Sequence, residues 1–266
     1  MTRVLSGAVL LVLAIAVVWF APAAVFLAVA ELLLVLAFVE YAGLARASGL
    51  TIPMLPAGAA AALTAAAFAR LTLGGFAIGA VDAVLMSALV ALGALTIAQW
   101  QGGRDAIALA SATVFPALYL GLPIGAMIAI RESHGPQALF LMMLTVFVSD
   151  TAQYYSGRAF GRRPLAERIS PKKTLEGAIG GFLFGAAFLA IAGQWWLPML
   201  PPVVRAALGA TIVALGIAGD LFESMLKRSA GVKDSSALIP GHGGILDRID
   251  ALLFAAPIYY IVLRYV

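Results

Sequence analysis

The sequence predicts an all-α, polytopic integral membrane protein with about nine transmembrane helices. Hydrophobic residues make up 63% of the 266 positions and charged residues 11%, whereas soluble domains are nearer ~45–50% and ~25%. This composition excludes a soluble globular domain, and it also excludes a disordered chain, which needs low hydrophobicity and high charge. The apolar stretches are long and rich in Ala, Leu and Val, so we expect helices rather than the alternating strands of a barrel.

Nine segments approach the ~20 apolar residues that a helix needs to cross a bilayer, and proline or glycine residues separate them. The predicted spans are residues 4–20, 23–45, 56–73, 77–99, 106–130, 136–157, 175–196, 203–226 and 246–265. The first span follows Arg3 and ends in Ala21-Pro22-Ala23, which resembles a signal-peptidase site. We expect the first helix to be retained, with cleavage as the alternative.

The basic residues predict the orientation of these spans. With the N-terminus inside, 13 of the 17 Lys and Arg residues fall on the inner side and four on the outer side. Because basic residues collect on the cytoplasmic side, we expect a cytoplasmic N-terminus and a C-terminus outside. The compact chain favours a bacterial inner membrane.

Composition also narrows the chemistry. The sequence contains no cysteine, which excludes disulfides, thiolate metal sites and cysteine nucleophiles. The net charge is +4, but no basic stripe with interleaved aromatic residues is present, so we expect no nucleic-acid partner.

Charged residues are concentrated in one part of a single predicted membrane domain, residues 1–266. Residues 149–250 hold 19 of the 30 charged residues. We therefore expect residues 1–148 to be mainly a helical scaffold and residues 149–250 to carry a cytoplasm-facing active site. Within the scaffold, Glu40 near the inner end of its span is interpreted as an interfacial charge, whereas Glu31 in mid-span has no assigned role.

The end of the eighth span places polar side chains on one helical face. Asp220, Ser224 and Lys227 are spaced i, i+4 and i+7, and a carboxylate within an apolar run is costly unless it has a function or a partner. Asp247 and Asp250 share a face at the start of the ninth span. Between the two spans, the segment LIPGHGGI surrounds His242 with glycines, which let backbone N–H groups approach an anion.

The sixth span ends in a second charged segment. Asp150 lies within the apolar run, and arginines follow at its end. Ser170-Pro171 is predicted to open a turn before Lys172 and Lys173, and Thr174 is predicted to cap the next helix. Lysines near a helix N-terminus are typical of a phosphate site.

Together, these residue types favour chemistry on a nucleotide or a pyrophosphate. Carboxylates are the oxygen ligands that Mg²⁺ prefers, and lysines and arginines bind phosphates. Structural interpretations remain open for single residues. Asp220 could pair with Lys227 or with an arginine of a neighbouring helix, and the lysine pair could anchor the chain at the membrane surface.

The charged segments resemble those of the CDP-diacylglycerol synthases, also called phosphatidate cytidylyltransferases. Residues 224–250 are SMLKRSAGVKDSSALIPGHGGILDRID, and the matching positions are Ser224, Lys227, Arg228, Lys233, Asp234, Pro240, His242, Gly243, Gly244, Asp247, Arg248 and Asp250. The second segment matches at Asp150, Tyr154, Gly157, Arg158, Gly161, Arg162, Ser170 to Thr174, Glu176 and Gly177. Gln153 and Leu175 depart from the pattern, where a small residue and a tryptophan are common.

The resemblance implies the reaction CTP + phosphatidic acid → CDP-diacylglycerol + pyrophosphate, with Mg²⁺ as cofactor and room for a second cation. It implies a membrane bilayer as environment, and a second copy of the chain is a candidate partner. Asp220 and Asp247 are the expected metal ligands. The expected catalytic residues are Asp150, Lys172, Lys173, Ser224, Lys227, Arg228, Asp234, His242 and Asp250. The expected substrate-binding residues are Arg158, Arg162, Ser170, Lys233, Gly243, Gly244 and Arg248.

Two alternatives remain at this point. A CTP-dependent polyprenol or phytol kinase would transfer the γ-phosphate to a lipid alcohol and release CDP. An ion-coupled transporter would use Asp150 and Asp220 for cation or proton binding, but it would be expected to show two pseudo-repeated halves. We find no such repeat in the sequence, and the charge lies on one side.

Overall fold

The computed structural model describes residues 2–69, 72–73, 76–77, 81–103, 105–239, 241 and 243–265. Helices dominate it, which confirms the predicted all-α class. The elements in chain order are α1 Thr2–Phe20, α2 Ala23–Ala47, α3 Met54–Ala66, β1 Thr72–Leu73, β2 Phe76–Ala77, α4 Val81–Gln99, α5 Ala106–Pro116, the π-helix η1 Ala117–Gly121, α6 Leu122–Phe160, β3 Pro164–Ala166, β4 Ser170–Thr174, α7 Leu175–Trp196, α8 Pro202–Ser229 and α9 Leu246–Tyr265.

Within the described residues, five helical segments are long and apolar enough to cross a membrane. These segments are Ala23–Ala47, Val81–Gln99, Ala106–Phe160, Leu175–Trp196 and Pro202–Ser229. The protein is therefore an all-α membrane protein by this measure, whereas the predicted count of nine spans is not confirmed. The third predicted span differs most, because α3 has only 13 residues and reaches ~20 Å at 1.5 Å per residue.

The predicted break between the fifth and sixth spans is confirmed as a kink. Helix α6 has 39 residues, but Gly135 within it has φ 83° and ψ 167°, which is not helical. A positive φ is readily available only to glycine, and the following Pro136 cannot donate an N–H to the helix. The kink divides the 55-residue segment and sets the direction of the part that carries Asp150.

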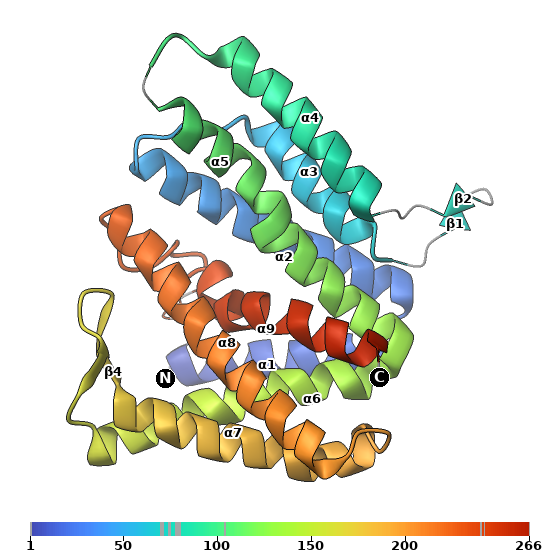
Figure 1. The fold of residues 1–266 in the computed structure, drawn as a ribbon, viewed down its shortest axis with the longest axis vertical. Coiled ribbons are helices and arrows are strands. Elements are labelled where there is room, and N and C mark those ends of the chain that lie inside the picture. Colours follow the sequence, from blue (N-terminus) through green and yellow to red (C-terminus); the bar gives the residue numbers. More distant parts are fainter. Residues whose placement is uncertain are drawn as a thin grey trace.

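Helices α6 to α9 form the most extensively packed part of the protein. The C-terminal half of α6 lies beside α7, and α8 crosses them (Figure 1). Glycines on α7 permit the close approach: a β-carbon at Gly177 would lie 3.3 Å from the α-carbon of Gly157 on α6. Small residues at such crossings let backbones touch. This packing places the ends of α6 and α8 and the start of α7 near one another.

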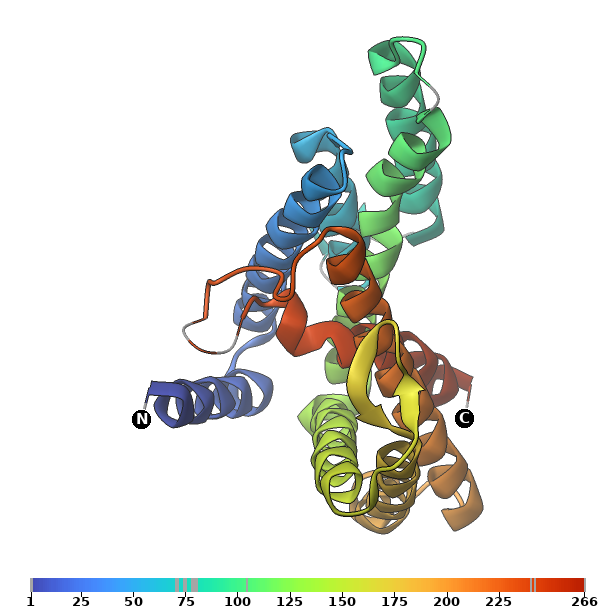
Figure 2. The ribbon, with the colours of Figure 1, turned by 90° about the vertical axis from the view of Figure 1, so that its left-hand side faces the viewer.

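The segment between α6 and α7 is a hairpin. Strands β3 and β4 pair antiparallel, with Pro164 opposite Thr174 and Ala166 opposite Ser170. The turn is formed by residues 167–169, so the predicted turn at Ser170-Pro171 is wrong. Pro171 is tolerated within a strand because an edge strand leaves some N–H positions unpaired. Figure 2 shows the hairpin in front of α8.

An aromatic cluster joins the N-terminal helices to the charged half. Tyr119 of η1 contacts Phe222 of α8 with ring centroids 5.3 Å apart, and Phe222 contacts Phe254 of α9 at 5.4 Å. Aromatic pairs at these separations contribute beyond their buried area. The cluster packs α8 against α9 beside the polar residues described next.

Candidate active site

The two charged sequence segments meet through one ion pair. Lys173 on β4 contacts the Asp220 carboxylate on α8, and the two side chains are 23% and 32% exposed. Ser224 Oγ donates a hydrogen bond to Asp220 Oδ1 at 3.4 Å, so the predicted shared face of α8 is confirmed for these two residues. Arg228 adds a second link, because its Nε donates to the carbonyl oxygen of Ile169 at 3.4 Å.

The start of α7 holds Lys173 in place. The Thr174 hydroxyl accepts a hydrogen bond from the Gly177 N–H at 3.1 Å, which confirms the predicted N-cap. Glu176 in the first turn accepts hydrogen bonds from the backbone N–H groups of Arg162 and Arg163 at 3.0 and 3.2 Å. The hairpin is therefore fastened at its base, directly beside the lysine that reaches α8.

Three carboxylates approach one another at this place. Asp150 of α6, Asp220 of α8 and Asp250 of α9 lie close enough for their charges to interact. Gln153 donates a hydrogen bond to Asp150 at 3.0 Å, so this departure from the family pattern supports a site residue. Grouped carboxylates repel one another unless cations compensate them, and Lys173 supplies part of that compensation.

Lys227 is buried between two carboxylates. It forms ion pairs with Glu223 on the preceding helical turn and with Asp247 at the start of α9. The side chains of Lys227, Glu223 and Asp247 are 10%, 0% and 6% exposed. Lys227 therefore neutralises protein carboxylates in this structure, and the alternative pairing of Asp220 with Lys227 is replaced by pairing with Lys173.

Asp247 organises the loop that precedes α9. It accepts hydrogen bonds from the Gly244 N–H at 2.8 Å, the Ser235 N–H at 3.0 Å and the Ser235 hydroxyl at 2.7 Å. Gly243 has φ 77°, and a β-carbon there would lie 3.2 Å from Asp247 Cγ. The glycines thus bring the backbone to a protein carboxylate.

Glu40 of α2 is a member of this arrangement that the sequence did not reveal. It is 6% exposed. Its carboxylate accepts hydrogen bonds from the Ser236 hydroxyl and from the N–H groups of Ile245 and Leu246, and it lies within hydrogen-bond distance of the Ser235 hydroxyl. Glu40 is therefore not simply a charge at the membrane interface, because its buried carboxylate binds the loop before α9.

The other predicted residues are exposed, are half-buried, or lie outside the described part. Exposed side chains are those of Arg158, Arg162, Lys172, Arg228, Lys233, Asp234 and Arg248. Arg158 lies within 3.4 Å of the Tyr154 hydroxyl, and Ser170 is half-buried on β4. His242 and Pro240 fall outside the described residues.

The carboxylates of this site are suitable ligands for Mg²⁺, but in the described part of the chain their positions do not converge on one point. The three neighbouring aspartates supply hard oxygen donors. However, within the described residues no group of three or more Asp, Glu or His side chains converges as ligands for a metal ion. Asp220 and Asp247 are instead each bound by a lysine.

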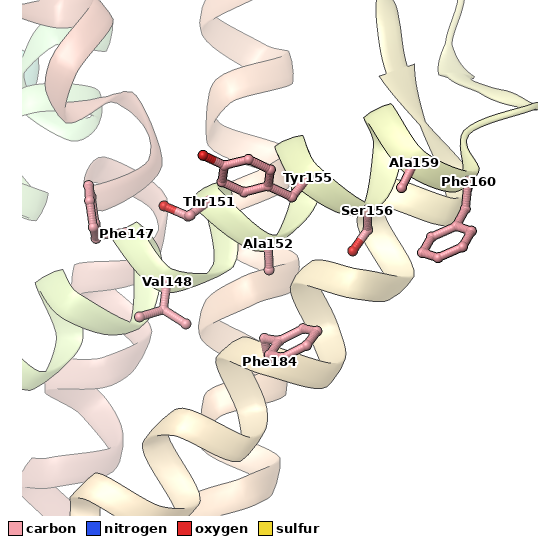
Figure 3. Close-up of a pocket in the computed structure, with 9 residues that line it drawn as sticks. All are labelled: Phe147, Val148, Thr151, Ala152, Tyr155, Ser156, Ala159, Phe160 and Phe184. Carbon is pink, nitrogen blue, oxygen red and sulfur yellow. The ribbon is translucent and has the colours of Figure 1, made fainter.

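A separate apolar groove of about 520 Å³ runs along α6 and α7 (Figure 3). Its lining is mostly hydrophobic, and none of the predicted site residues takes part in it. The lining residues are Phe147, Val148, Thr151, Ala152, Tyr155, Ser156, Ala159, Phe160 and Phe184. The charged centre is therefore distinct from this groove.

Comparisons with known proteins agree with the motif analysis. The model of the cytidylyltransferase family matches residues 1–266. The phosphatidate cytidylyltransferase of Aquifex aeolicus is 38% identical over 149 residues, which cover 56% of this chain and 54% of the relative. That of Haemophilus influenzae is 43% identical over 130 residues, 47% of this chain and 45% of the relative. That of Mycobacterium bovis is 41% identical over 155 residues, 58% and 50%. The chain spans about half the length of these relatives.

Proposed function

Because the chain belongs to the cytidylyltransferase family, we propose that it is a phosphatidate cytidylyltransferase of phospholipid biosynthesis. It joins CTP and phosphatidic acid to give CDP-diacylglycerol and pyrophosphate. The bacterial relatives of that name support this choice. The observation that carries the proposal is the Lys173–Asp220 ion pair, which unites two charged segments 47 residues apart in one site.

The exposed cations on the elements that meet at this ion pair suit a phosphate-rich substrate. The exposed cations include Lys172 on the hairpin, Arg158 at the end of α6 and Arg228 at the end of α8. Lysines and arginines bind phosphate oxygens by charge-assisted hydrogen bonds. A triphosphate and a lipid phosphate can both find partners there, because the cations lie on three different elements.

The proposed reaction needs little acid–base chemistry. A phosphate oxygen of phosphatidic acid forms a new bond to the α-phosphorus of CTP, and the bond from that phosphorus to the bridging oxygen of the β-phosphate breaks. The electron pair of that bond leaves with pyrophosphate. A phosphate monoester is already anionic near neutral pH, so catalysis rests on positioning and charge neutralisation. Lys172 and Lys173 are the proposed phosphate contacts.

Magnesium remains part of the proposal, with Asp220 and Asp247 as its proposed ligands. Lys173 and Lys227 would have to release these carboxylates when the ion binds. Mg²⁺ keeps several waters and commonly binds through one or two carboxylates together with substrate phosphates. The arrangement of the protein side chains alone therefore does not exclude it.

The proposed location is a bacterial inner membrane, with the N-terminus and the active site on the cytoplasmic side. CTP is soluble, and the lipid tails of phosphatidic acid stay in the bilayer, so a site at the membrane surface lets the two substrates meet. We further propose residues 1–148 as scaffold and residues 149–250 as the part that carries the active site.

An assay on the purified protein in detergent tests the proposal. CTP, phosphatidic acid and Mg²⁺ are supplied, and pyrophosphate and CDP are followed separately. We expect pyrophosphate release that depends on the lipid, with no matching release of CDP. Release of CDP would instead favour a lipid kinase. A folded sample that turns over no nucleotide would contradict both.

A further inference from the structure

Glu40 lies on α2, in the half of the chain that carries few charges, yet it contacts the loop before α9. Its Oε1 accepts hydrogen bonds from the Ser236 hydroxyl at 2.7 Å and the Ile245 N–H at 2.9 Å. Its Oε2 accepts one from the Leu246 N–H at 2.8 Å and lies 3.0 Å from the Ser235 hydroxyl, whose single proton can go either to Glu40 or to Asp247. Four hydrogen-bonding groups of one loop therefore converge on a single buried carboxylate.

Two of these donors belong to the N-terminus of α9, which begins at Leu246. The first N–H groups of a helix have no partner within the helix, and a negative charge near them is favourable. Such N–H groups are normally satisfied by the side chain of a capping residue at the start of the same helix. Here the carboxylate comes from a residue more than 200 positions earlier.

Glu40 is also linked to the ion-paired part of the site. The Ser235 hydroxyl lies within hydrogen-bond distance of Glu40 and of Asp247, at 3.0 and 2.7 Å. Asp247 in turn holds Lys227. A β-carbon at Gly244 would collide with the Glu40 carboxylate, so the loop can take this path only with glycine at that position.

We propose that Glu40 is a positioning residue, which holds residues 235–236 against the start of α9 at residues 245–246 and thereby sets the place of Asp247 and Lys227. This inference rests on the proposed cytidylyltransferase activity only for its effect on rate. The fixing of the loop is independent of that activity. Glu40 does not touch the reacting atoms, and its effect passes through Ser235 and the α9 N-terminus.

The test compares Glu40→Gln with Glu31→Gln, which changes the other glutamate of α2. Glutamine replaces one acceptor oxygen by a donor, so it leaves an N–H of the loop without an acceptor. Hydrogen–deuterium exchange is measured on the intact protein in detergent. In Glu40→Gln we expect exchange of the peptide covering residues 235–246 to rise by about tenfold, with α7 unchanged. Glu31→Gln should leave both unchanged.

Kinetics then separate positioning from general stability. We expect Glu40→Gln to lower kcat by ~10–100-fold, the size that small misplacements of catalytic groups cause, with KM for CTP changed much less. Unchanged exchange at residues 235–246, or faster exchange with a normal kcat, would overturn the inference. If Glu40→Gln does not fold, Ser236→Ala removes a single donor and must show the same pattern more weakly. A wild-type protein without turnover contradicts the proposed function, whereas the exchange result still decides the role of Glu40.

Discussion

Replacing Lys227 with methionine should destabilise the protein strongly. Lys227 is the cation between Glu223 and Asp247, and all three side chains are at most 10% exposed. Removing one partner of a buried pair costs about 3–5 kcal/mol, because the other charge stays buried without compensation. Methionine keeps the length of the side chain, so the loss is one of charge rather than of volume.

This free energy corresponds to a large shift in thermal unfolding. At ~2–4 °C per kcal/mol for a chain of this size, we expect the Tm to fall by about 6–20 °C. The assay is thermal unfolding of the purified protein in detergent. Lys172→Met is the matched control: Lys172 is exposed on β4, and its substitution should move Tm by no more than ~2 °C.

A double variant isolates the electrostatic cause. Adding Glu223→Gln to Lys227→Met removes one of the two uncompensated carboxylates, so it should recover part of the lost Tm. A Lys227→Met protein that melts within ~2 °C of wild type would refute the view that Lys227 neutralises these carboxylates. So would a double variant that is less stable than the single one.

Three further predictions concern the site and its helices. Asp220→Asn and Asp247→Asn should each abolish turnover in a protein that still folds and inserts. The control Asp82→Asn, on the exposed start of α4, should keep a rate within about twofold of wild type. Near-normal rates in both site variants would contradict their assignment. Gly219→Val should lower Tm by an amount equivalent to ~1–3 kcal/mol, because even a β-carbon there would lie 3.2 Å from the α-carbon of Ala251. An unchanged Tm would show that α8 and α9 can separate freely. EDTA should abolish turnover and added Mg²⁺ should restore it, whereas full activity in EDTA would exclude the proposed metal.

The features that depend on nearby residues, namely a helix cap, a helix break and a shared helical face, could be predicted from the sequence. Thr174 was predicted as an N-cap from its position before an apolar helix, and it caps α7. The break predicted between the spans 106–130 and 136–157 is the kink at Gly135 in α6. The spacing of Asp220 and Ser224 placed them on one face, where they lie within 3.4 Å. Each of these depends on residues at most a few positions apart.

The partners of the buried charges could not be predicted in this way. Asp220 pairs with Lys173 across 47 positions, and Glu40 binds donors about 200 positions away. No periodicity encodes such distances, since they follow from how the helices pack. Glu223 differs from these residues, because its partner could have been predicted. It stands four positions before Lys227, and this spacing is typical of an ion pair on one helix.

The length of α3 shows the limit of apolar composition as a guide. Residues 56–73 are apolar enough to predict a span, but α3 ends at Ala66 and residues 67–69 form turns. Apolar composition alone does not fix where a helix stops, since a turn can be as hydrophobic as the helix before it. The class of the protein was therefore more predictable than the number of its spans.

The most direct test of the central claim follows the phosphorus atoms of CTP. The purified protein is given phosphatidic acid, Mg²⁺ and CTP labelled with radioactive phosphorus at either the α or the γ position, and the lipid fraction is then extracted. Cytidylyl transfer predicts label in the lipid from the α position and none from the γ position. Label that enters the lipid from the γ position would mean that this site transfers a phosphoryl group, and the account of the function would be wrong.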